Sequence, residues 1–141
     1  MPKPEDKPRV IRKVALAYFK DKKLIVGRDN KNAEVFVAIG GKVEEGESDI
    51  DCLKREVKEE IYTELDPASV KFLHEFNGPA HGKPDAVLNI RFYEGQIIGQ
   101  PKPTQEIVEI DYFDSHTDPK HLSEISRTQV FPWLKDHGYI T

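Results

Sequence analysis

Three glutamates in one short stretch of the chain are the residues best suited, by type and spacing, to do chemistry. Glu56, Glu59 and Glu60 fall on one arc of a helix predicted over residues 49–63. Carboxylates this close repel one another and weaken an isolated helix, so a positive partner should lie against them. Oxygen ligands of high negative charge suit a hard divalent cation, and the pattern predicts a site for Mg²⁺, with Mn²⁺ as the alternative.

The residues around these glutamates are suited to hold them in place. Gly40 and Gly41 form a predicted turn before the helix, where glycine allows positive φ and close approach of the backbone to a ligand. Ser48 is a suitable N-cap, and Asp51 occupies the position of a capping-box acid. A narrow apolar stripe on the helix must face a core, and it consists of Ile50, Leu53, Val57 and Ile61.

A second interpretation of this stretch is a solvated helix without a site. Arg55 and Glu59 are four residues apart, a spacing that forms ion pairs on exposed helices, and such charge runs are common. The Gly40-Gly41 turn and Glu47 precede Arg55 at fixed offsets, which an ordinary surface helix does not require. The whole arrangement therefore favours the site.

The order of these residues resembles the signature box of the Nudix (MutT-like) hydrolases. Gly41, five residues, Glu47, seven residues and then Arg-Glu-Val-Lys-Glu-Glu at 55–60 match the spacing of that box. The chain departs from the family in having Tyr62 where a glycine is expected and Ile39 where a proline is frequent. Neither departure removes a chemical group. Outside the box the likeness is weaker, but it extends over most of the chain.

The resemblance implies both a fold and a reaction. The fold is an α/β fold of the α+β type, an α/β/α sandwich with a mixed central sheet. The reaction is metal-dependent hydrolysis of a nucleoside diphosphate linked to another group, and we expect an oxidised or ordinary nucleoside or deoxynucleoside triphosphate. ADP-ribose or another nucleotide sugar is the alternative substrate. A non-catalytic nucleotide sensor is the alternative function, but it would be expected to lack Arg55, Glu59 or Glu60, and all three are present.

The resemblance also assigns roles to residues. The metal ligands are Glu56, Glu59, Glu60 and a backbone carbonyl of Gly40 or Gly41. Arg55 is expected to orient a neighbouring glutamate through its bidentate fork. The candidates for contact with substrate are Lys42, Phe36 and His81.

The general base has two candidates. Glu59 comes first, because a carboxylate beside the cation can take a proton from water. Glu106 comes second, because residues 105–112 are similar to a late segment from which many Nudix enzymes draw a further carboxylate. The alternation of residues 106–110 leaves open which of Glu106 and Glu109 faces the site.

Composition limits the partners of the protein. The chain has 141 residues, of which 33% are charged, and a net charge of −4, so no general attraction to nucleic acid or membranes is implied. Cys52 is the only cysteine, which excludes a disulfide within the chain. We expect a cytoplasmic monomer or homodimer that acts on a small-molecule nucleotide. Residues 1–8 are predicted to form a flexible tail and residues 9–141 a single domain.

The remaining elements follow from hydrophobic alternation and turn residues. Strands are predicted over residues 10–19, 24–26, 35–39, 69–76, 86–93, 97–98 and 107–113, with 97–98 continuing the main sheet. Residues 77–84 are expected to form a loop that lines a pocket. Residues 122–137 are predicted to be helical with a break at Pro132. Tyr62 is predicted to stay right-handed, since tyrosine resists positive φ.

Overall fold

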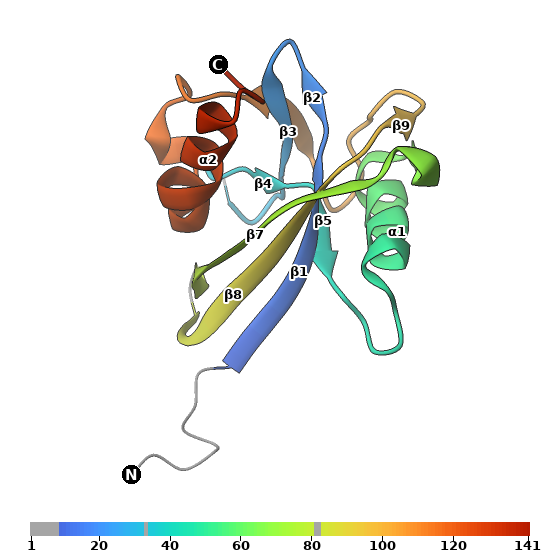
Figure 1. The fold of residues 1–141 in the computed structure, drawn as a ribbon, viewed down its shortest axis with the longest axis horizontal. Coiled ribbons are helices and arrows are strands. Elements are labelled where there is room, and N and C mark those ends of the chain that lie inside the picture. Colours follow the sequence, from blue (N-terminus) through green and yellow to red (C-terminus); the bar gives the residue numbers. More distant parts are fainter. Residues whose placement is uncertain (1–8, 33, 81–82) are drawn as a thin grey trace.

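A mixed sheet lies between two helical layers, with α1 on one side and the C-terminal helical segment on the other (Figure 1). The computed structural model describes residues 9–32, 34–80 and 83–141. The central sheet has the strand order β5-β1-β8-β7. β1 runs parallel to β8, while β5 and β7 are antiparallel to their neighbours. Its strands are β1 (Arg9–Ala17), β5 (Gly40–Lys42), β7 (Lys71–Ala80) and β8 (Lys83–Glu94). The predicted α/β/α sandwich of the α+β type with a mixed sheet is confirmed.

Two smaller sheets complete the strand layer. The first has the order β10-β3-β2, with β4 also paired to β3, and the second is the antiparallel pair β6-β9. Their strands are β2 (Phe19–Lys20), β3 (Lys23–Arg28), β4 (Val37–Ala38), β6 (Glu64–Leu65), β9 (Ile97–Ile98) and β10 (Glu109–Phe113). Residues 97–98 therefore do not continue the main sheet as predicted, because they pair with the chain that leaves α1.

Alternation along the central strands creates two hydrophobic cores. On β1, Val14 and Leu16 face α1, whereas Ala15 and Ala17 face the C-terminal helical segment. The α1 side is completed by the predicted apolar stripe, of which Leu53, Val57 and Ile61 are fully buried. The opposite side contains Phe76, Phe92, Ile125, Val130 and Leu134. Burying both faces of β1 and β8 fixes the register of the sheet on which the candidate site is built.

Helix α1 (Asp49–Ile61) begins as the sequence predicts and ends earlier than predicted. The hydroxyl of Ser48 accepts a hydrogen bond from the backbone N–H of Asp51 at 3.1 Å. The helix stops at Tyr62, whose φ of 56° and ψ of 36° are left-handed, so the prediction of a right-handed Tyr62 is wrong. The Tyr62 N–H still donates a hydrogen bond to the carbonyl of Lys58 at 3.2 Å. The left-handed turn at Tyr62 allows both the residue before it, Ile61, and the residue after it, Thr63, to be buried.

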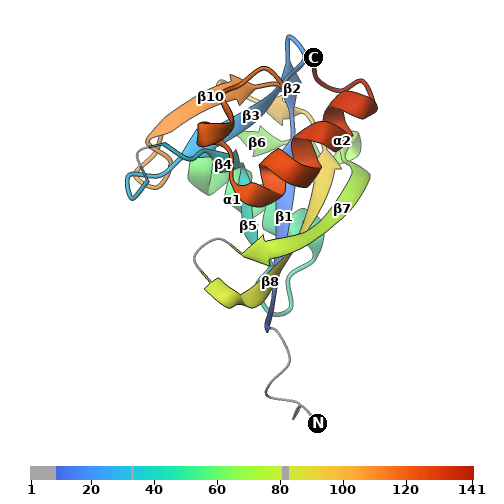
Figure 2. The same cartoon turned by 90° about the vertical axis from the view of Figure 1, so that its left-hand side faces the viewer.

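The C-terminal helical segment crosses one face of the sheet (Figure 2). A π-helical turn, η4 (Ser126–Val130), leads directly into α2 (Phe131–Asp136), and Pro132 stands in the first turn of α2. The predicted break at Pro132 is therefore not seen, because Val130 and Phe131 keep helical dihedrals and the segment changes from π-helical to α-helical geometry without interruption. The π-helical turn directly before Pro132 is where the regular α-helical pattern is altered next to a residue that has no N–H to donate. Two short 3₁₀ turns, η2 (Pro67–Ser69) and η3 (Pro119–His121), join other elements.

Two further expectations about local structure are wrong. The predicted loop over residues 77–84 is mostly the end of β7 and the start of β8, which pair across the hairpin. Gly40 and Gly41 lie in the short strand β5, which pairs with Ala15 and Val14 of β1. Both errors arise because cross-strand pairing overrides the local preferences of proline and glycine.

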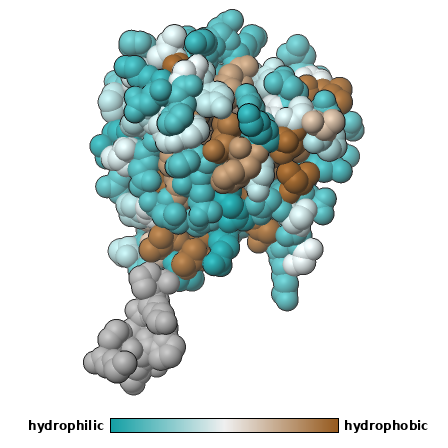
Figure 3. Space-filling model, in the orientation of Figure 1, coloured by the Kyte–Doolittle hydropathy of each residue, from teal (hydrophilic) through white to brown (hydrophobic). Residues whose placement is uncertain are grey.

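The face shown in Figure 3 is mostly hydrophilic, with hydrophobic residues in small groups. Large hydrophobic side chains that are exposed are Val10, Val37, Tyr62, Phe72 and Ile98. Across residues 9–32, 34–80 and 83–141, none of the helices has the length and apolar character needed to span a bilayer.

Candidate active site

Arg55 joins the turn before α1 to the glutamates on the helix. Its Nε and Nη2 donate to the two carboxylate oxygens of Glu47 at 2.9 and 3.0 Å, which is the bidentate geometry of a guanidinium fork. Its Nη1 donates to Glu56 at 2.7 Å and, more weakly, to Glu59 at 3.4 Å. Arg55 Nη2 also donates to the carbonyl of Lys42 at 3.3 Å. One side chain thus orients both Glu47 and Glu56.

These contacts shift the acidity of Arg55 and Glu47. The side-chain hydrogen bonds from Arg55, together with the backbone N–H of Glu44, lower the pKa of Glu47 to about 2. The same bonds, first those to Glu47 and then those to Glu56, raise the pKa of Arg55. The pair is therefore ionised at any pH near neutrality.

Glu60 is the buried carboxylate of the site. It is 9% exposed, and it accepts one hydrogen bond from the N–H of Gly40 at 2.8 Å. The pKa of Glu60 is raised to about 8, first by burial and then by the charges of Glu56 and Glu106, while the hydrogen bond from the Gly40 N–H acts in the opposite direction. A carboxylate in this position is strained electrostatically unless a positive charge is added beside it.

Glu106 reaches this group from a distant part of the sequence. The connector that carries it is fastened to the end of α1, because Thr104 Oγ1 donates to the Glu60 carbonyl at 3.0 Å and the Lys102 N–H bonds to the Ile61 carbonyl at 3.0 Å. Burial raises the pKa of Glu56, and the charges of Glu59 and Glu106 add to that rise. We call Glu56, Glu59, Glu60 and Glu106 the acid cluster. Glu109 lies elsewhere and pairs with Arg28 at 3.0 Å.

The backbone at Gly41 lies directly against the acid cluster. A Cβ atom at Gly41 would lie 2.5 Å from both Cδ and Oε1 of Glu56, so any side chain there would displace that carboxylate. The Cys52 thiol donates to the carbonyl of Lys42 at 3.3 Å, which ties α1 to β5 beneath Arg55. Because glycine has no side chain, strand β5 and the Glu56 carboxylate can pack directly against each other.

The acid cluster fits a divalent cation by its chemistry. Within the described part of the chain, no three His, Cys, Asp or Glu side chains are already arranged around a common cation position. The observed rotamers instead turn Glu56 toward Arg55 and Glu60 toward Gly40. Glu60 is a buried carboxylate of raised pKa that lies beside the other three glutamates of the acid cluster. The backbone at Gly41 packs against this group without a side chain. All the available ligand atoms are therefore oxygens, and a cation would stabilise them. The residues that would hold it are Glu56, Glu59 and Glu60.

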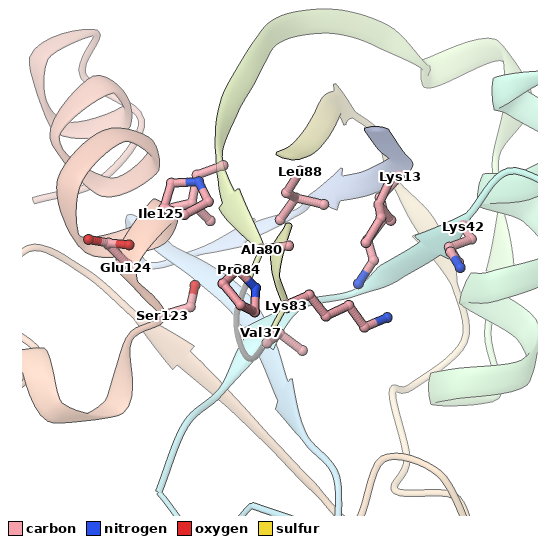
Figure 4. Close-up of a pocket in the computed structure, with 12 residues that line it drawn as sticks. Lys13, Val37, Lys42, Ala80, Lys83, Pro84, Leu88, Ser123, Glu124 and Ile125 are labelled. Carbon is pink, nitrogen blue, oxygen red and sulfur yellow. The ribbon is translucent and has the colours of Figure 1, made fainter. Parts of the chain in front are cut away.

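A pocket of about 550 Å³ lies between the central sheet and the C-terminal helical segment. Three lysines from three strands line one end, Lys13 of β1, Lys42 of β5 and Lys83 of β8, while Glu124 lies at the other end (Figure 4). We call it the lysine pocket. The remaining lining residues are Ile11, Val37, Pro79, Ala80, Pro84, Leu88, Ser123 and Ile125.

Lys13 lines the lysine pocket and is also influenced by the charges of the acid cluster. Burial and then the charge of Lys83 lower the pKa of Lys13, whereas the charges of Glu60 and Glu56 act in the opposite direction. The sequence analysis did not identify Lys13 or Lys83 as site residues. The available signal was a lysine directly before a run of apolar residues, since Lys13 is followed by Val14 and Ala15.

The structure places the other predicted residues as follows. Lys42 is exposed at the mouth of the lysine pocket. Phe36 is 6% exposed and packs edge-to-face on Phe113 at 4.8 Å, so its observed role is core packing and not contact with a substrate. His81 lies outside the described residues.

Comparison with known proteins identifies the family. The model of the NUDIX domain matches residues 10–134, so the chain belongs to the NUDIX domain family and is an enzyme of the pyrophosphohydrolase class. Enzymes of this family generally use divalent metal ions and act on small-molecule nucleotides.

Solved structures of the family share the fold. A Chromobacterium violaceum protein assigned provisionally to the Nudix hydrolases has a TM-score of 0.72 and 22% identity, with 90% of this chain and 77% of that chain covered. A MutT NUDIX hydrolase from Burkholderia pseudomallei has a TM-score of 0.70 and 18% identity, with coverage of 84% and 94%. A UDP-X diphosphatase has a TM-score of 0.70 and 22% identity, with coverage of 97% and 68%.

Proposed function

We propose that this enzyme hydrolyses a pyrophosphate bond of nucleoside triphosphates, oxidised or ordinary, with Mg²⁺ as its cation. The observation that carries the proposal is that the acid cluster and the lysine pocket adjoin, since Lys42 lines the pocket and directly follows Gly41, whose backbone lies against Glu56. A substrate that bridges the two must combine several phosphates with a larger, partly apolar group. Nucleoside triphosphates have both parts.

The acid cluster supplies the charge arrangement that phosphoryl transfer requires. A divalent cation held by Glu56, Glu59 and Glu60 would neutralise the negative charge that otherwise repels an attacking water. Arg55 keeps Glu56 in place through the 2.7 Å bond of Nη1. Since Glu59 is half exposed and held only by a 3.4 Å contact, it is free to take the proton from that water.

Glu106 is the second candidate for the base. Its charge acts on both Glu56 and Glu60, although it is an exposed residue of the connector before β10. Because the charges of both Glu59 and Glu106 act on Glu56, both candidates lie close enough to the rest of the acid cluster to serve it as the base. We propose that Glu106 approaches the reacting water only when substrate is bound.

Two alternatives have specific support. The similarity to a UDP-X diphosphatase favours a nucleotide sugar or ADP-ribose as the substrate class. A non-catalytic sensor has less support, because Arg55 is bonded to both Glu56 and Glu59 as a functional site would require.

A substrate panel tests the proposal. The enzyme is incubated with Mg²⁺ and each of several nucleoside triphosphates, oxidised purine triphosphates, ADP-ribose and nucleotide sugars, and the release of phosphate, pyrophosphate and monophosphate is scored. We expect turnover of triphosphates that is abolished by a chelator and restored by Mg²⁺ or Mn²⁺. Full turnover in the chelator, or no turnover of any compound, would contradict the proposal.

A further inference from the structure

We propose that the lysine pocket distinguishes substrates by the number of their phosphates, with Lys13 and Lys83 binding a third phosphate group that nucleotide sugars lack. This inference rests on the proposed function and names the substrate class of the same site. It gives a role to Lys13 and Lys83, two residues outside the signature box. The ligand recognised is a linear triphosphate.

The first argument is the convergence of like charges. Lys13, Lys42 and Lys83 come from β1, β5 and β8, and their side chains meet at one end of the pocket (Figure 4). Among the residues that the structure describes, every ion pair is formed by an arginine, so lysines without an ion-pair partner are general in this protein. The feature that sets these three lysines apart is that they come from three strands and line one end of the same pocket, which favours an anion there.

The second argument is electrostatic cost. Lys13 is partly buried, and its pKa is lowered first by burial and then by the charge of Lys83. The charges of Glu60 and Glu56 offset part of this effect in the free protein. A bound anion would reduce the remaining repulsion between Lys13 and Lys83.

The third argument is the polarity of the pocket. Glu124 is the only carboxylate among the described lining residues, and it lies at the end opposite the lysines (Figure 4). A phosphate chain would avoid Glu124 and lie against the lysines, next to Lys13 and the acid cluster. The nucleoside would then lie along the apolar wall formed by Ile11, Val37, Leu88 and Ile125.

The fourth argument is the balance of charge. A nucleotide sugar carries about two negative charges on its diphosphate, whereas a triphosphate carries about four near neutral pH. A cation held at the acid cluster would offset the charge of two of the phosphates. The third phosphate of a triphosphate adds about two negative charges, which Lys13 and Lys83 together would match, whereas a nucleotide sugar offers these lysines no such group.

Binding of inorganic phosphates without metal tests the inference directly. Calorimetry in a chelator compares tripolyphosphate with pyrophosphate for the full chain. We expect tripolyphosphate to bind about tenfold tighter, the gain expected from one further charge-assisted contact. Lys83→Gln should remove that preference, as should Lys13→Gln. Lys135→Gln changes an exposed lysine on α2 and is the matched control, which should bind as the wild type does.

Kinetics give the second measurement. For a nucleoside triphosphate and the diphosphate glucose of the same nucleoside, Lys83→Gln should lower kcat/KM about tenfold for the first and less than about twofold for the second. Because Lys83 is exposed, Lys83→Gln should fold even if the half-buried Lys13→Gln does not. Equal losses for both substrates, or unchanged tripolyphosphate affinity in Lys83→Gln, would overturn the inference. A wild type that prefers tripolyphosphate but hydrolyses no nucleotide would contradict only the proposed function.

Discussion

The acid cluster and the lysine pocket are adjacent regions of opposite charge that are held in different ways. Glu56 and Glu60 are fixed by Arg55 and by the Gly40 N–H at 2.7 and 2.8 Å. The ammonium groups of Lys13 and Lys83 have no such ion-pair partner in the described structure. The protein thus holds Glu56 and Glu60 by hydrogen bonds before any ligand binds, and it leaves its lysines for a ligand to position. The contrast applies to these two carboxylates, since Glu59 and Glu106 are exposed.

The largest expected effect comes from neutralising the acid cluster. Glu59→Gln and Glu60→Gln keep the size of the side chain and, at residue 60, an oxygen that can accept from the Gly40 N–H. Turnover should fall by orders of magnitude, while the melting temperature holds or rises because carboxylate repulsion is relieved. Steady-state kinetics and thermal melts measure the two effects. If both variants unfold instead, the acid cluster is structural and the contrast with the lysine pocket fails.

The backbone beneath the acid cluster gives the next largest effect. Gly41→Ala places a methyl group 2.5 Å from the Glu56 carboxyl carbon, so we expect a loss of kcat of about a hundredfold with the fold retained. Gly40→Ala instead meets the backbone of Val14 and requires a φ of 155° from an alanine, so it should lower the melting temperature. Similar effects of the two variants on activity and melting would show that the rigidity of the cluster does not depend on Gly41.

The next prediction concerns Glu106, the member of the acid cluster that comes from the connector before β10. If Glu106 acts only in the substrate complex, Glu106→Gln should lower kcat about tenfold or more and leave KM nearly unchanged. Glu109→Gln is the control, since Glu109 pairs with Arg28 at 3.0 Å and is half exposed, and it should change neither constant. Wild-type turnover in Glu106→Gln would leave Glu59 as the remaining candidate base.

The stability of the metal-free protein should depend on pH through Glu60. Its pKa of about 8 is above the 4.5 of an ordinary glutamate, so the folded state binds the proton more tightly than the unfolded state. This contribution to stability is complete below about pH 4.5 and is lost as the pH rises through about 8. Melts in a chelator should therefore show a fall in Tm from pH 5 to pH 8 that is smaller in Glu60→Gln. An identical fall in both proteins would assign the pH dependence to other groups.

The smallest effect is expected at the end of α1. Tyr62→Gly removes a left-handed tyrosine that is 64% exposed, and it should raise the free energy of unfolding by about 0.5–1 kcal/mol. Tyr62→Phe keeps the strain and should leave that energy unchanged. Chemical denaturation measures both variants. A loss of stability in Tyr62→Gly would mean that the tyrosine side chain itself supports the helix that carries the acid cluster.

The sequence predicted the acid cluster much better than the lysine pocket, for a physical reason. Glu56, Glu59 and Glu60 are neighbours on one helix, so their spacing alone places them together. Lys13 lies opposite Ile90 in the pairing of β1 with β8, whereas Lys83 pairs with Ala80 at the start of β8, so the two lysines line one pocket only through the tertiary arrangement of the strands. Such an arrangement depends on burial over the whole sheet, and no local pattern reveals it.

The errors at Tyr62 and at residues 77–84 have the same origin. A left-handed tyrosine costs energy locally, but the turn allows Ile61 and Thr63 to be buried together. The glycine and proline of residues 78–79 favour a loop locally, but pairing of Gly78 with Leu88 and Pro79 with Val87 extends the strands. Local preference is a weak guide wherever tertiary contacts decide.

The parallel pairing of β1 with β8 also has a consequence for the order in which the protein can fold during synthesis. β1 is synthesised before both of its neighbours in the sheet, β5 and β8, and β8 ends at Glu94. Until β8 is made, the apolar residues of β1 have no complete sheet to join. Because pairing across so long a stretch is slow, the nascent chain exposes these apolar residues during that interval, when chaperones bind such segments.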